Sequence, residues 1–280
     1  MPSFDTPEPI SATAHVEAGS IQFTAGDRLD TVVEVLPRDP KKDLDVRTAA
    51  QTEVVYANGV LGVRTPKSGL FGRTGVLDVT VELPAGSHIG VTGSWAQVLG
   101  EGRLGEVQVK TSVGDVRLDT TGPLKVAAAH GSVTVDRVEG LAEVTTSSGS
   151  LRIGVVDGPA VLKNSHGSTN VGVVAGELRV RGANGDIDIR RAEDSVAAFT
   201  AHGLLRVGEV VRGTVQLETN YGSIEVGVRA GTAAWLDAHS RSGQVRNSLT
   251  ASDSPEESED TVTVRARTRH GNIDVRRAKV

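Results

Sequence analysis

The sequence predicts an all-β fold: a parallel β-solenoid of about 18 residues per coil, two nine-residue strand-turn units each, with an irregular N-terminal β cap. Three observations predict it. Glycines recur every nine residues from Gly122 to Gly203, with Asp194 filling the one gap. In each unit the second and fourth residues after the glycine are apolar, as in Gly131-Ser-Val133-Thr-Val135. The 280 residues include 33 glycines, and Val, Leu and Ala dominate the apolar residues.

Each unit reads as one short strand and one tight turn. Apolar residues two apart share one face of a strand, and glycine permits the backbone of the turn. Two units return the chain to its start about 4.8 Å further along, which builds two parallel sheets around a thin core. The expected inner residues of one sheet are Val116, Leu118, Val133, Val135, Leu151, Ile153, Val171, Ile187, Ile189, Leu205, Val207, Ile224 and Val226; the other sheet supplies Leu124, Val126, Val144, Leu162, Leu178, Val180, Val196, Val215 and Leu217.

Two other folds share parts of this pattern. Helices are disfavoured because of the glycine content, the many Val, Ile and Thr residues, and the two-residue alternation. An antiparallel sandwich remains an alternative, since short strands at regular spacing also suggest it.

The regular repeat occupies only part of the chain. Residues 1–95 are expected to form the cap, continuous with the solenoid, and residues 96–280 the solenoid itself. Residues 248–260 are acidic and rich in serine, which favours a disordered insertion within the last coil. Expected cap strands are Ile10–Phe23 (with a Gly19-Ser-Ile21-Gln-Phe23 unit), Thr31–Leu36, Thr52–Arg64, Val76–Leu83 and Ser87–Thr92, with loops at Pro37–Asp45 and Pro66–Gly75.

Composition argues against several classes. The net charge of −5 and the low aromatic content, two Trp, two Tyr and four Phe, argue against nucleic-acid binding. Without cysteine there is no disulfide, thiolate metal site or catalytic thiol. Met1–Ile10 lacks the pattern of a signal peptide, and no apolar run is long enough to span a membrane. A cytoplasmic protein is expected, with export by a non-Sec route left open.

The glycine-punctuated units and the preceding segment from Val79 to Ser87 resemble the bacterial putative-adhesin family of β-strand-repeat proteins, largely a domain of unknown function. The resemblance covers nearly the whole chain. It implies a right-handed β-solenoid and no known catalytic residues.

The nine-residue period is also similar to calcium-binding β-rolls, but the residues that would bind the ion do not match. Those repeats need a second glycine and a repeated Asp ligand. Here Asp115 and Asp186 are isolated among Ser132, Ser150 and Ser168. No calcium, other metal or cofactor is therefore expected.

The charges at one outward-facing position of each coil test whether the coils stack as a parallel ladder. The third residue after successive coil-start glycines is Asp188, Arg206, Glu225, Arg246 and Asp274. From Asp188 onward, neighbouring coils alternate in charge sign at this position, as a parallel ladder favours.

Histidine is the strongest anomaly. His130, His166, His202 and His270 each precede a coil-start glycine, and Asn184 and Tyr221 fill the same column. The first three lie on alternate coils, about 9.6 Å apart, which is too far for one zinc ion. Either the column is an edge that binds a partner, an anion or a metal, or the corner simply tolerates polar residues.

Three other features of the sequence bear on function. Leu70 and Phe71, between glycines and basic residues, suggest either a binding loop or part of the cap. Trp235 lies where the nine-residue register slips. Ser165-His166 and His239-Ser240 lack the motif of a serine hydrolase, and no catalytic residue is predicted.

We therefore expect a non-catalytic β-solenoid scaffold or protein-binding module, with self-association as one form of it. The candidate interaction surface is His130, His166, His202, Tyr221, Leu70 and Phe71. The alternatives are a carbohydrate-active β-helix enzyme and a surface adhesin exported by a non-Sec route.

Overall fold

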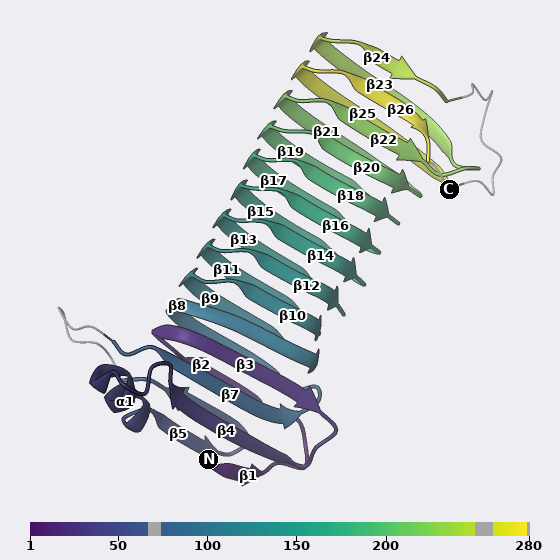
Figure 1. The fold of residues 1–280 in the computed structure, drawn as a ribbon. Helices are drawn as coiled ribbons and strands as arrows, with labels where there is room; N and C mark the ends of the chain where they lie inside the picture. The colour runs from purple at the N-terminus through teal and green to yellow at the C-terminus, as the bar shows by residue number, and fades with distance from the viewer. Residues whose placement is uncertain (67–73, 250–259, 279–280) are drawn as a thin grey trace. The chain divides into compact units, whose positions relative to one another are not determined.

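The computed structural model describes residues 1–66, 74–249 and 260–278. Strand makes up 69% of the chain and helix 3%, and parallel strands go round an axis, so the predicted all-β solenoid is confirmed (Figure 1). The chain divides into two units, Met1–Glu139 and Gly140–Val280. Two parts of the sequence predictions lie outside the described residues: Leu70 and Phe71 of the candidate interaction surface, and residues 250–259 of the expected insertion.

The second unit consists of two parallel sheets. The order in the first sheet is β13 (Ala142–Ser148), β15 (Ala160–His166), β17 (Leu178–Asn184), β19 (Val196–His202), β21 (Gly213–Tyr221), β25 (Thr261–His270), β23 (Ala233–Ser242). The order in the second is β14 (Leu151–Val156), β16 (Thr169–Val174), β18 (Ile187–Ala192), β20 (Leu205–Val210), β22 (Ile224–Val228), β26 (Ile273–Arg277), β24 (Val245–Asn247).

The last coils of this unit do not stack in sequence order. The coil of β25 and β26 lies between the coil of β21 and β22 and the coil of β23 and β24 (Figure 1). The outermost coil is therefore residues 233–247, and the C-terminal coil lies beneath it.

The first unit also has two sheets. One runs β5 (Glu53–Ala57), β6 (Val60–Arg64), β2 (Ser11–His15), β8 (His88–Arg103), β9 (Val107–Val113), β11 (Leu124–His130). The other runs β1 (Ser3–Asp5), β4 (Asp30–Pro37), β7 (Leu77–Pro84), β3 (Ala18–Gly26), β8, β10 (Val116–Thr121), β12 (Val133–Val138). The long β8 bends from one sheet into the other.

The outermost strands of the first unit are antiparallel. β4 pairs antiparallel with β1 and β7, and β5 with β6. Asn58 and Gly59 make the β5–β6 turn with φ of 51° and 74°, as a two-residue hairpin requires. An antiparallel edge does not continue the parallel ladder of a solenoid, so the parallel ladder ends at these strands.

The core matches the expected inner residues. Every residue of both expected inner layers is buried, as are Ile21 and Phe23 of the early unit. Two further buried columns were not predicted. One is apolar and includes Val138, Val156, Val174, Ala192 and Val210; the other is largely polar and includes Thr146, Asn164, Thr200, Thr219 and Thr268.

Close packing between coils explains the glycine period. Gly203 has φ +146°, and a Cβ there would lie 2.2 Å from the carbonyl oxygen of Gly185 in the adjacent coil. Any side chain would force the two coils apart, so the repeat needs glycine for both backbone conformation and space.

The N-terminal region departs from expectation at one helix. The loop expected at Pro37–Asp45 ends in α1 (Asp43–Ala50). Asp43 and Asp45 lie in its first turn, where the helix dipole favours negative charge. The expected strand Ile10–Phe23 is also divided, into β2 and β3.

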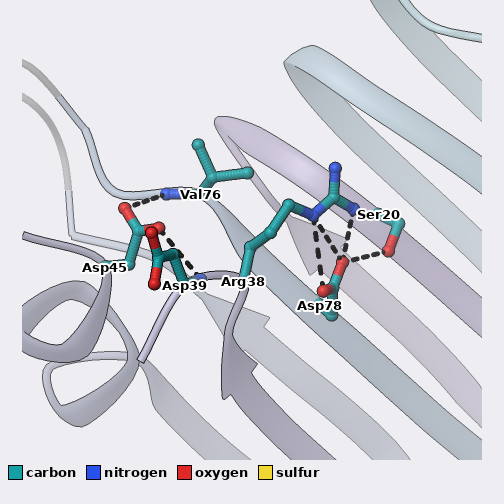
Figure 2. Close-up of polar contacts among 6 residues, drawn as sticks. All are labelled: Ser20, Arg38, Asp39, Asp45, Val76 and Asp78. Carbon is teal, nitrogen blue, oxygen red and sulfur yellow. Dashed lines mark hydrogen bonds and ion pairs between the residues drawn. The ribbon is translucent and has the colours of Figure 1, made fainter. Parts of the chain in front are cut away.

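Polar contacts fasten α1 and its flanking strands (Figure 2). The Asp45 carboxylate accepts hydrogen bonds from the backbone N–H groups of Val76 (3.0 Å) and Asp39 (3.3 Å). Arg38, which follows β4, donates to Asp78 of β7, and Ser20 of β3 donates to the same carboxylate at 2.6 Å. The hydrogen bonds from Arg38 lower the pKa of Asp78.

Candidate functional site

A column of polar and aromatic side chains runs along one corner of the second unit. His166, Asn184, His202 and Tyr221 end β15, β17, β19 and β21, and each lies in register with the next. His270, which ends β25, follows Tyr221. The structure thus brings together three of the residues proposed from the sequence, His166, His202 and Tyr221, which we call the ring column together with Asn184 and His270.

Three rings of this column stack. The centroids of His202 and Tyr221 lie 5.1 Å apart with 3° between the planes, and those of Tyr221 and His270 lie 4.8 Å apart with 8°. The spacing follows from the separation of neighbouring strands, about 4.8 Å. Tyr221 is 53% exposed, so the stack presents its edges to solvent.

The order in which the coils lie creates this stack of rings. In sequence order Ser242 would follow Tyr221, but β25 lies between β21 and β23, so His270 takes that place and Ser242 pairs with His270 instead. The sequence placed His270 in the column without indicating which residue it would contact.

The structure describes the other sequence-predicted residues either in the first unit or not at all. His130 ends β11 in the first unit, is exposed and pairs with Val113 there. Leu70 and Phe71 are outside the described residues. Neither set contributes to the ring column as the structure describes it.

The histidines are not arranged as a metal centre. Asn184 separates His166 from His202, and Tyr221 separates His202 from His270. In the ranges that the structure describes, no group of three or more His, Asp or Glu side chains could hold a metal ion.

The serine and histidine residues named above, and the neighbouring aspartates Asp186 and Asp188, have hydrogen-bond or ion-pair partners within the fold. Ser240 donates to the carbonyl of Gly271 at 2.8 Å, and His166 Nδ1 lies 3.3 Å from the carbonyl of Ser147. Asp186 accepts from the backbone N–H of Leu204 at 2.7 Å, and Asp188 lies 4.0 Å from Arg206. These contacts stabilise turns and neighbouring coils.

The expected alternation of charge between neighbouring coils holds for only some of the outward residues from Asp188 to Asp274. Arg206 lies between Asp188 and Glu225 and forms ion pairs with both, at 4.0 and 3.9 Å. Beyond Glu225 the expectation is wrong, because the inserted coil places Asp274 beside Glu225. Arg276, 3.7 Å from Glu225, offsets part of this like-charge contact.

The outermost strand of the second unit was not predicted as a feature. Among the described residues, β23 pairs with β25 on one side and has no strand on the other. Ala234, Leu236 and Ala238 on its inner side are only half-buried, and Trp235 is 68% exposed. In the sequence, the only sign of this unpaired end strand was the break in the nine-residue glycine spacing at Trp235. We call β23 and its exposed side chains the open edge.

The model of the Toastrack DUF4097 family matches residues 77–276, so the chain belongs to this family, a domain of unknown function. The family resemblance found in the sequence is thereby confirmed.

Solved structures with some similarity come from three bacteria. A putative adhesin from Bacteroides fragilis shares 15% identity over 98% of this chain and 95% of its own, with a TM-score of 0.39. A putative cell adhesion protein from Clostridium sporogenes shares 10% over 99% and 98%, with a TM-score of 0.20. A putative adhesin from Parabacteroides distasonis shares 10% over 98% and 96%, with a TM-score of 0.26.

No curated protein matches the chain. Within the described residues, no helix has the length and apolar character that crossing a membrane requires.

Proposed function

We propose that this protein is a non-catalytic scaffold that self-associates end to end through the open edge of its second unit. The observation that carries the proposal is the unpaired side of β23, a strand of ten residues with half-buried apolar side chains. An unpaired strand offers backbone hydrogen-bond groups to another strand, and pairing would cover Ala234, Leu236 and Ala238.

The partner that fits this edge is a second copy arranged by a two-fold axis. The outermost strands of the first unit are antiparallel, which disfavours stacking β23 of one copy on them in a parallel ladder. Two β23 strands can pair antiparallel with each other, which gives an isologous interface.

The charges on β23 suit this symmetry. Outward residues alternate along the strand as Trp235, Asp237, His239 and Arg241. An antiparallel pair centred on His239 places Asp237 opposite Arg241 twice, and opposite charges across a strand pair are favourable. The ring column ends at His270, which pairs with Ser242 of β23, so it lies beside this edge and would extend the contact surface.

Light scattering after size exclusion tests the proposal over a range of concentrations. The wild-type chain is expected to shift from monomer to dimer. Ala238→Lys places a charge on the inner side of the open edge and is expected to keep the chain monomeric. The matched control is Ala197→Lys. Ala197 is exposed and lies on β19, a strand that is paired on both sides, so this variant should dimerise like wild type. A wild-type chain that stays monomeric at the highest concentration contradicts the proposal.

Cytoplasmic location belongs to the same proposal and is tested by fractionating the host. A protein found only at the cell surface would favour the adhesin alternative. A catalytic role on sugars is disfavoured by the structural roles of Ser240, Asp186 and Asp188 described above.

A further inference from the structure

The first unit carries a hollow that the scaffold role does not use. The hollow has a volume of about 550 Å³ and opens on the outer face of the sheet formed by β6, β2, β8, β9 and β11. Its floor is low because small residues face outward there, among them Thr13, Gly90, Thr92 and Ala127. Long side chains rise around them.

The permanently charged residues that line this hollow are all cationic. Arg64, Lys110, Lys125 and His15 line it, and none of its lining residues is Asp or Glu. Within the described parts of the chain, no carboxylate forms an ion pair with Arg64 or Lys110. A single-sign hollow is unexpected in a chain with 35 acidic and 30 basic residues.

Nearby carboxylates have other partners or positions. Glu17 is 3.0 Å from His15 Nε2 and accepts a hydrogen bond from Ser94 at 2.7 Å. Glu106 accepts from Gln108 at 2.7 Å. Glu53 of β5 lies opposite Arg64 in the strand register without an ion pair to it. None of these carboxylates lines the hollow, and in the described parts of the chain none forms an ion pair with Arg64 or Lys110.

A hollow of about 430 Å³ in the second unit shows the contrast. Three of its arginines have acidic partners: Arg206 and Arg276 pair with Glu225, and Arg191 with Glu209. There the charges stabilise neighbouring coils. In the first unit the cations Arg64 and Lys110 are left for a ligand.

Spacing and shape select the class of ligand. Arg64 and Lys110 lie on strands three steps apart, about 14 Å at the usual strand separation. One small anion would therefore contact both only if the two side chains extended toward each other across the hollow. An extended ligand with several negative charges fits better. Thr13, Thr92 and Gln108 line the hollow with hydroxyl and amide groups, which are the kinds of group that bond to sugar hydroxyls. In this structure they bond to Leu61, His15 and Glu106, so a sugar would have to share or replace these partners.

A peptide and a membrane fit less well. β6, β2, β8 and β9 each pair on both sides, so an acidic peptide would find no strand edge to extend. A concave site also suits a chain-like ligand better than a flat bilayer surface.

We propose that this hollow binds an acidic polysaccharide, whose carboxylates contact Arg64 and Lys110. The proposal is independent of the open edge, since the residues involved belong to the first unit.

Calorimetry with an oligomer of six galacturonic acids tests this proposal in low and high salt. The full chain is expected to bind the oligomer, and added salt should weaken binding because it screens the charges. Maltohexaose, an uncharged oligomer of the same length, should not bind. Lys110→Glu should weaken binding about tenfold or more, since it replaces an attraction by a repulsion.

The matched control is Lys163→Glu, because Lys163 is the fourth residue of β15 as Lys110 is of β9. Its binding should stay within about twofold of wild type. Thermal unfolding of both variants checks that they fold. The proposal is overturned if the oligomer does not bind, if maltohexaose or hexaglutamate binds as tightly, or if the two variants weaken binding equally. Light scattering on Lys110→Glu should show unchanged self-association. A failure of the polysaccharide proposal can then be told apart from a failure of the self-association proposal.

Discussion

Single buried polar residues stabilise the turns between coils. Asn164 of β15 is 2% exposed, and its Nδ2 donates to the carbonyls of Gly149 and Gly167, both at 3.1 Å. In other coils the same position is threonine: Thr219 donates to the carbonyl of Gly203 at 3.3 Å and Thr268 to that of Gly222 at 2.9 Å. This column satisfies carbonyls that the glycine turns leave inside the protein.

Asn164→Ala should therefore lower the free energy of unfolding by about 1–3 kcal/mol, because it leaves buried carbonyls without a donor. Urea unfolding measures this change. Asn164→Thr is the control, since threonine fills this position elsewhere in the unit, and it should retain a large part of the stability. Equal stability of wild type and Asn164→Ala would contradict a role in satisfying the turn.

At the scale of elements, the order of the last coils follows from how apolar they are. The inserted coil supplies Val262, Val264 and Ala266 as inner residues, all at most 1% exposed. The outermost coil supplies Ala234, Leu236 and Ala238, which are half-buried. Because an end coil is covered on one side only, placing the more apolar coil inside removes more apolar surface from water.

This order can be tested with paired cysteines, since the chain has none of its own. Gln216 lies in register with Arg265, and Asp237 pairs with the opposite side of Arg265. Gln216→Cys with Arg265→Cys should form a disulfide on oxidation, because adjacent strands lie about 4.8 Å apart and disulfides bridge Cα atoms at roughly 4.4–6.8 Å.

Gln216→Cys with Asp237→Cys is the control pair. Its residues are two strands apart, about 9.6 Å, and should stay reduced. The reverse result, read from masses after trypsin digestion, would mean that the coils stack in sequence order.

For the whole molecule, stability rests on packed apolar columns in both units. The inner positions are filled by Val, Leu and Ile, and the residue after each turn glycine is not a repeated carboxylate: it is Ser168, Asp186 and Leu204 in successive coils. Asp186 itself is engaged with the backbone of Leu204. Such turns do not supply the set of oxygen ligands that calcium needs.

Calcium and chelators should accordingly leave thermal unfolding unchanged. Scanning calorimetry in excess calcium, and separately in excess EDTA, is expected to give the same midpoint as metal-free buffer. A midpoint that rises with calcium concentration would reveal a bound ion, since a ligand that binds the native state stabilises it.

The sequence by itself determined the coil. Glycine at nine-residue steps and apolar residues two apart specify a turn and an inner face, and both are local properties of the backbone. That is why the predicted inner residues, from Val116 to Val226, are all buried. The family resemblance rested on the same repeat.

Only the tertiary structure decided which coil lies beside which. A coil at the end of the chain fits several neighbours equally well by pattern, and the choice depends on total burial. This is why the charge alternation fails at Glu225 and Asp274, and why Tyr221 stacks on His270. The hollow lined by Arg64 and Lys110 arises in the same way, because strands far apart in sequence become neighbours in the first unit.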